Sequence, residues 1–224
     1  MNKEDAIKKV EEYVPHDEEQ HEAREELLRY LKCEDKPSPQ PVFDSVVLEL
    51  SDVCEFLIHS GCGIDEINTC LDEGYWWSPL MYAIKLGNKD IFSLLLENGA
   101  DIHYWATEQE QCPLGVAVEY GRTEMFFELV RRGVPISVEY FDEMIYFTFE
   151  CPKEELLMNA IENRNEKITL FLLEQGCDLN SHIRYGWENF WEYAKRINAL
   201  DFLEHVASLY KNKVSYTDLL AGEK

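Results

Sequence analysis

Apolar and polar positions follow a pattern that recurs along the chain after 34 residues. One copy spans residues 78–101, opening with SPLMYA, passing Gly87 and closing with LLLENGAD. The next spans residues 112–133, opening with CPLGVA, passing Gly121 and closing with LVRRG. The proline, the leucine, the alanine and both glycines return in register. Self-similarity at such a period is the signature of a repeat protein.

Each recurring residue has a role in a pair of short helices. Ser78 can cap the first helix through its hydroxyl, and Pro79 suits the first helical turn, where its missing N–H is not needed. Gly87 supplies the left-handed conformation that ends this helix. Apolar residues then recur at helical spacing as far as Gly99. Two helices this short must stack on further copies to bury their apolar faces.

Weaker copies extend the pattern in both directions, so we predict about five repeats within residues 37–210. Residues 1–36 carry apolar residues at helical spacing and are predicted to form an N-terminal helical cap, or else a small docking element. Alternating prolines beside this boundary mark a linker, and residues 211–224 are expected to form a tail. The expected repeats span residues 37–70, 74–108, 109–152, 153–185 and 186–210.

The copy at residues 78–101 resembles an ankyrin repeat, whose consensus runs Thr-Pro-Leu-His-x-Ala, then Gly, then Leu-Leu-Leu-x-x-Gly-Ala-Asp. The match is fair in the two following copies and weak in the outer two. Leu156 replaces the proline, while Glu49 and the pair Asn163-Arg164 stand where a helix-ending glycine is expected. The resemblance implies an all-α, ankyrin-type solenoid of helix-turn-helix repeats.

The resemblance also implies that the chain binds proteins through the turns between repeats, or fingers, and through the exposed face of each first helix. Aromatic and acidic residues at these positions are typical of interface hot spots and favour a basic partner. Trp76 and Trp77 could instead pack against the next finger or the cap. The predicted partner-binding residues are Asp72, Glu73, Tyr75, Trp76, Trp77, Tyr82, Tyr104, Trp105, Glu108, Glu110, Glu119, Tyr120, Tyr140, Asp142, Glu143 and Glu162, with Asn163, Tyr185 and Trp187 in the same regions.

An insertion interrupts the repeat between Gly133 and Gly176, which are 43 residues apart. Insertions in repeat proteins usually form loops on one face, often the binding face. The alternative is that the later aromatic residues fold back as additional core. We expect Tyr140, Asp142 and Glu143 to be more exposed than these later aromatics.

Charge is compatible with a basic partner, although an acidic surface can also serve solubility alone. The chain has 44 acidic and 21 basic residues and a formal net charge of -23, a balance that repels nucleic acid and anionic membranes and accelerates encounter with a basic protein. Seven cysteines without CxxC pairs favour reduced thiols over disulfides or a zinc site. The start lacks the features of a secretory signal, so we expect a cytoplasmic monomer, with export by a signal-less route left open.

No catalytic, metal-binding or cofactor-binding constellation stands out. HExxH and GxSxG arrangements are missing from the sequence, and the histidines are scattered. We therefore expect a non-enzymatic binding protein without a cofactor. The leading hypothesis is an inhibitor or immunity protein that neutralises a basic toxin. The alternatives are an adaptor or secreted effector that bridges partner proteins, and an enzyme with an unfamiliar site.

Overall fold

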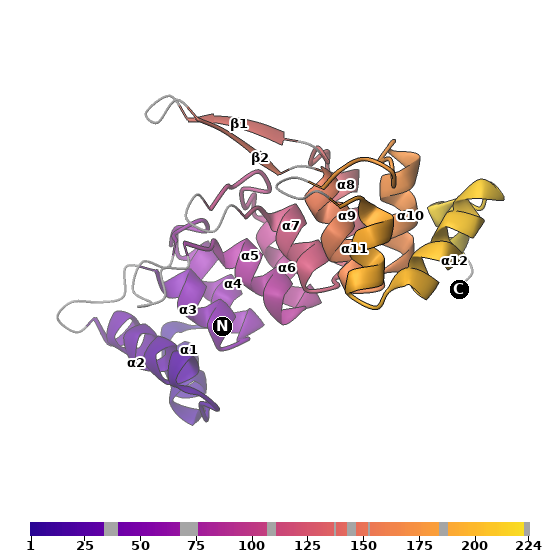
Figure 1. Ribbon diagram of the computed structural model, residues 1–224. Coiled ribbons are helices and arrows are strands. Elements are labelled where there is room, and N and C mark those ends of the chain that lie inside the picture. Colours follow the sequence, from indigo (N-terminus) through magenta and orange to yellow (C-terminus); the bar gives the residue numbers. More distant parts are fainter. Residues whose placement is uncertain are drawn as a thin grey trace. The chain divides into compact units, whose positions relative to one another are not determined.

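The fold is seen in a computed structural model of the full chain (Figure 1). The structure describes residues 1–33, 40–67, 76–106, 111–136, 138–142, 147–151, 153–183 and 188–221. Contacts group the chain into two compact units, Met1–Pro113 and Leu114–Lys224.

Short helices that pack in pairs build the first unit. Its helices are α1 (Lys3–Glu12), α2 (Glu18–Lys32), α3 (Pro41–Val47), α4 (Ser51–His59), α5 (Pro79–Leu86) and α6 (Lys89–Glu97). Helix α3 packs on α4 and α5 packs on α6, while α3 also contacts α5 and α4 contacts α6. First helices and second helices therefore form two layers, as stacked helix-turn-helix repeats require.

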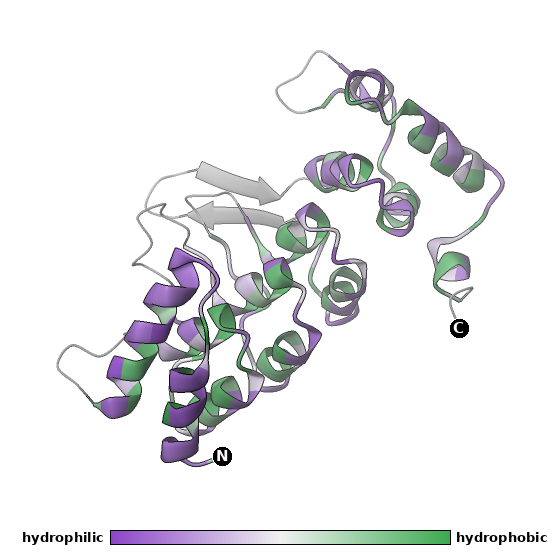
Figure 2. Cartoon of the chain, turned by 90° about the horizontal axis from the view of Figure 1, so that it is seen from below, coloured by the Kyte–Doolittle hydropathy of each residue, from purple (hydrophilic) through white to green (hydrophobic). Residues whose placement is uncertain are grey.

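The first two helices form a hairpin that covers the first repeat. Helix α2 packs on both α1 and α3, and α1 also contacts α4. Arg24 of α2 closes the end of α1, because its guanidinium donates to the carbonyl oxygens of Val10 at 3.0 Å and Glu11 at 2.9 Å. An ion pair between Lys9 and Asp52 joins α1 to α4. Figure 2 shows these two helices as largely hydrophilic, with hydrophobic residues on one side, the amphipathic pattern that a cap requires.

The second unit continues the helix pairs. It comprises α7 (Pro113–Glu119), α8 (Thr123–Arg131), α9 (Lys153–Glu162), α10 (Glu166–Glu174), α11 (Phe190–Arg196), α12 (Leu200–Lys211) and α13 (Tyr216–Ala221). Helix α9 packs on α10 and beside α11, and α10 packs beside α12 and α13. An edge-to-face contact between Phe126 and Phe171, with ring centroids 5.6 Å apart, joins α8 to α10.

The five expected helix pairs are therefore present, which confirms the prediction of helix-turn-helix repeats. Gly87 ends its helix with a φ of 77°, as predicted. Glu49 and Arg164 adopt the same left-handed conformation without being glycine, with φ of 54° and 50°. This conformation costs a non-glycine residue about 1–2 kcal/mol, and both side chains offset part of it by bonding to the next repeat. The Glu49 carboxylate accepts from Asn88 at 3.0 Å, and Arg164 donates to the Asn198 carbonyl at 2.6 Å.

The insertion adds a β-hairpin to the all-α repeat fold. Strands β1 (Val138–Asp142) and β2 (Phe147–Cys151) pair antiparallel, with Val138 opposite Cys151. Alternating β-branched, aromatic and polar residues over these two stretches favour strands over helices. In the described part of the chain, the strands make their extensive contacts with each other and not with a helix. Tyr140 lies opposite Phe149 in the register.

Thr169 offers a test of the packing around α10. It is fully buried, and among the described residues its hydroxyl has no hydrogen-bond partner. We expect Thr169→Val to raise the free energy of unfolding by about 1 kcal/mol, because it removes a buried polar group without changing the volume. Urea unfolding would measure this change. Thr123→Val is the control and should destabilise, since the Thr123 hydroxyl accepts from Asn165 at 2.6 Å. A loss of stability in Thr169→Val would contradict the expectation.

Candidate functional site

Two successive fingers of the first unit are hydrogen-bonded to each other. The Tyr104 hydroxyl donates to the carbonyl oxygen of Trp76 at 2.8 Å, and the backbone N–H of Asp101 donates to the Asp65 carboxylate at 2.9 Å. The Trp76 side chain remains 43% exposed, whereas Trp105 is half-buried. Burial also raises the pKa of the Tyr104 hydroxyl. The Trp76 side chain thus lies at the surface, and the hydrogen bond from Tyr104 of the next finger holds its backbone in place.

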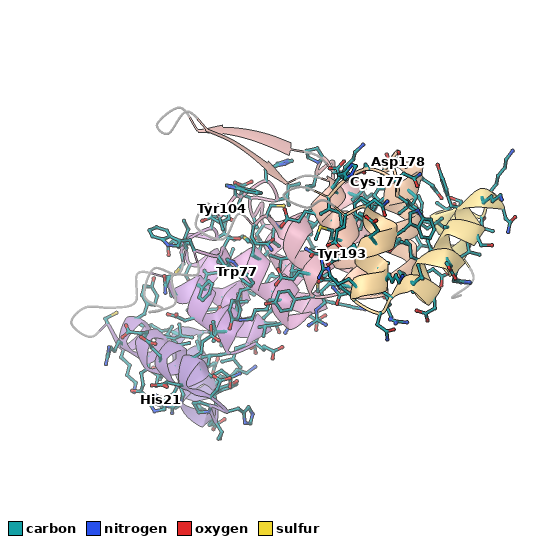
Figure 3. The ribbon with its side chains drawn as sticks, in the orientation of Figure 1. His21, Trp77, Tyr104, Cys177, Asp178 and Tyr193 are labelled. Carbon is teal, nitrogen blue, oxygen red and sulfur yellow. The ribbon has the colours of Figure 1, made fainter. Side chains whose placement is uncertain are left out.

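The structure corrects the expectation that Trp77 and Tyr82 lie on the binding surface. Only 4% of Trp77, which is labelled in Figure 3, and 5% of Tyr82 are exposed. Their rings meet edge to face at 6.5 Å, and Phe43 contacts Tyr82 at 5.1 Å. The Lys85 ammonium lies over the Tyr82 ring at 4.6 Å and over the Trp77 ring at 5.6 Å. These residues form an aromatic layer beneath the surface, which agrees with the packing alternative for Trp77.

The second unit gathers predicted residues at the ends of its first helices. Glu119 and Tyr120 follow one another at the end of α7 and are exposed, although partial burial of its carboxyl raises the pKa of Glu119. The Asn163 amide, at the end of α9, donates to the carbonyl oxygens of Val118 at 3.1 Å and Glu119 at 2.9 Å. The ends of α7 and α9 are therefore held side by side, which brings Glu119, Tyr120 and Glu162 onto one edge of the unit.

Two residues that sequence reasoning did not single out support this edge, and one of them, Tyr193, does so from beneath the surface, because it is only 2% exposed. The Tyr193 hydroxyl (Figure 3) donates to the Glu162 carboxylate, and the Arg196 guanidinium lies 4.9 Å from the Tyr193 ring centroid. Arg196 also pairs with Glu188 at 2.6 Å. Burial and the bond to Glu162 raise the pKa of Tyr193, while Arg196 lowers that of Glu188. The repeat pattern could have pointed to Tyr193 and Arg196. They are an aromatic residue and a cation three positions apart, as Tyr82 and Lys85 are in α5.

The remaining predicted residues are not placed by the structure. Tyr140 and Asp142 belong to strand β1, where only the backbone pairing is described. Those outside the described residues are Asp72, Glu73, Tyr75, Glu108, Glu110, Glu143, Tyr185 and Trp187.

Asp65 makes the finger contacts sensitive to pH. Its pKa is raised chiefly by burial, and further by the Asp101 carboxylate, whereas the Asp101 N–H lowers it. A carboxyl whose pKa is raised by folding stabilises the fold below its unfolded pKa and loses that contribution as the pH rises through its folded pKa. Asp65→Asn keeps the acceptor and removes the charge, so we expect greater stability at neutral pH, by less than about 1 kcal/mol because the group is partly exposed.

Urea unfolding at neutral pH and at about pH 3, below the unfolded pKa of aspartate, would measure this effect. The gain should disappear at the lower pH. Asp201→Asn is the control with the opposite sign, because the Phe202 N–H and Arg164 lower the pKa of Asp201. Equal or lower stability of Asp65→Asn at neutral pH would contradict the expectation.

Among the described residues, no group of three or more histidine, cysteine, aspartate or glutamate side chains could hold a metal ion. Within the same residues, no helix combines the length and the apolar character that crossing a bilayer requires.

Comparison with known proteins agrees with the repeat geometry. The family model for ankyrin repeats (3 copies) matches residues 45–142, which begin in α3 and end with β1. A search of curated proteins gives no match. Ankyrin repeats form a non-enzymatic fold that serves as a protein–protein interaction module. The resemblance seen in the sequence is confirmed for residues 45–142, which match ankyrin repeats.

Proposed function

We propose that this protein binds a basic protein through its fingers and the ends of its first helices, and that binding inhibits the partner, as an immunity protein neutralises a toxin. The observation that carries the proposal is Trp76, a 43% exposed tryptophan on a fixed finger of a chain with net charge -23. The protein would act as a cytoplasmic monomer. It would need no cofactor, because occlusion alone blocks the partner.

Two physical effects support this function. A tryptophan buries a large area on binding and loses little side-chain entropy, which is why tryptophan is frequent among interface hot spots. Surplus negative charge steers a basic protein toward the surface and raises the association rate. Lys85 and Arg196 do not reverse this field, because acidic residues outnumber basic ones by 44 to 21.

Affinity capture followed by one substitution tests the proposal. We expect the full chain at moderate salt to capture basic proteins, and Trp76→Ala to weaken the captured complex by about 2 kcal/mol, or roughly 30-fold. Higher salt should slow association more than it speeds dissociation. Tyr210→Ala, which removes another exposed aromatic residue on α12, should leave the affinity unchanged. Capture of only neutral or acidic proteins would contradict the proposal.

The hairpin favours a second candidate, an adaptor that bridges two partners. Strands β1 and β2 pair mainly with each other, and such an element could dock a further protein by strand addition. Removing residues 138–151 distinguishes the candidates, because an inhibitor should retain binding through its fingers whereas an adaptor should lose one partner entirely. Deleting α1 and α2 would be less informative, since they pack on the first repeat.

A further inference from the structure

The C-terminal helix α13 seats a tyrosine in a defined site on the second helices of its unit. The Tyr216 ring stacks on Phe127 at 5.2 Å with an interplanar angle of 7°, and it meets Phe171 edge to face at 4.9 Å. The Tyr216 N–H donates to the Glu174 carboxylate at 2.9 Å, and the Ser215 hydroxyl donates to the same group at 3.4 Å. Two aromatic walls and a carboxylate acceptor therefore fix the start of α13.

The rest of α13 extends toward a polar groove of about 500 Å³. Leu219 lines this groove together with Thr123 of α8, the loop residues Asn163–Asn165 and the first residues of α10. Tyr216 contacts the second half of α10, whereas Leu219 lies near its start, so α13 runs antiparallel to α10. The site thus accommodates an aromatic residue and a leucine three positions later in the same helix. The surface beside the leucine is polar.

Helix α13 is held less firmly than the residues on which it packs. None of the residues of α13 is buried, and six residues are too few for a helix that is stable alone. The linker before it begins at Lys213, whose left-handed conformation, with a φ of 59°, ends α12. Phe127 meets the fully buried Phe126 and also Phe171 edge to face, with ring centroids 5.2 and 5.5 Å apart. Segments with few buried contacts open locally while the core stays folded, so Phe127 and Phe171 should keep their places when α13 leaves.

We propose that the face formed by Phe127, Phe171, Glu174 and the adjoining groove is a second docking surface. Its partner is a short helical segment of another protein that carries an aromatic residue followed by leucine three positions later, with polar residues after them. Helix α13 is the intramolecular occupant, and the partner segment displaces it. This surface lies on the second helices, apart from the fingers, and its groove adjoins the first-helix ends at Gly121 and Asn163.

Peptide binding to the full chain tests this proposal. The probe is a fluorescein-labelled peptide with the sequence of residues 212–221, measured by fluorescence anisotropy. We expect weak binding to the wild-type chain, where tethered α13 competes, and binding that is about tenfold tighter or more to Tyr216→Ala, because its site is vacant more often. Adding Phe127→Ala to that variant should abolish the gain. A peptide with alanine in place of its tyrosine should not bind.

Three results would overturn the proposal. Circular dichroism must first show that both variants keep their helices, which we expect because Tyr216 and Phe127 are only half-buried. Failure of Tyr216→Ala to bind the peptide more tightly would show that α13 is a fixed part of the fold. Binding that survives Phe127→Ala would place the peptide elsewhere. A concentration-dependent dimer that exchanges α13 would identify a second copy of this chain as the occupant.

Discussion

Replacing Phe126 with alanine is expected to lower the free energy of unfolding by about 3–5 kcal/mol. The Phe126 side chain is fully buried, and its ring lies 5.2 Å from Phe127 and 5.6 Å from Phe171. Phe126→Ala would therefore leave a cavity in the contact that joins α8 to α10. Because the whole stability of a native protein is about 5–15 kcal/mol, this one change should bring the second unit close to unfolding.

Urea unfolding followed by circular dichroism would measure the loss. Phe127→Ala is the matched control, since it removes the same ring from the next position of the same helix, where the side chain is half-buried. Its effect should be clearly smaller. Equal losses of unfolding free energy for the two variants would mean that Phe126 contributes no more to the core than Phe127 does.

Leu27→Ala is expected to destabilise the first unit by about 2–5 kcal/mol. Leu27 is fully buried in α2, the helix that packs on α3. Every residue of α3 is buried, between α2 on one side and α5 on the other. Loosening α2 would expose α3 to water, and terminal repeats need such a cap. The expected loss follows from our proposal that residues 1–36 form the cap.

Thermal and urea unfolding of Leu27→Ala can be compared with Glu22→Ala, which changes an exposed residue of the same helix. The glutamate variant should stay within about 0.5 kcal/mol of the wild-type chain. A loss of that small size for Leu27→Ala as well would show that α1 and α2 form a docking arm instead of a cap.

Much of the fold follows from local chemistry that can be recognised in the sequence. Ser78 caps α5 by accepting from the Met81 N–H at 3.3 Å, and Gly87 ends the helix, as both residue types predict. The hairpin escaped prediction because its alternating pattern lies inside an insertion with no counterpart in the other repeats. Glu49 and Arg164 show a different limit, since hydrogen bonds to the following repeat support a conformation that local propensity disfavours.

The candidate surface was harder to predict, because exposure depends on neighbours that are distant in the sequence. Trp76 and Trp77 are adjacent and identical, yet the first is exposed and the second is buried against Tyr82 and Lys85. Residue type can select candidates but cannot separate such a pair. Glu162 likewise has its partner, Tyr193, on another helix.

The hydrogen bonds between successive repeats have a consequence for how this array can evolve or be engineered. Glu49 pairs with Asn88, Asn165 with Thr123, and Arg164 with Asn198, and each pair joins a different junction. Arrays of identical consensus units can be lengthened or shuffled, because every junction is the same. Here each repeat carries a contact suited to only one neighbour. A duplicated or transplanted repeat would meet the wrong partner, so the order of the repeats is encoded in their junctions.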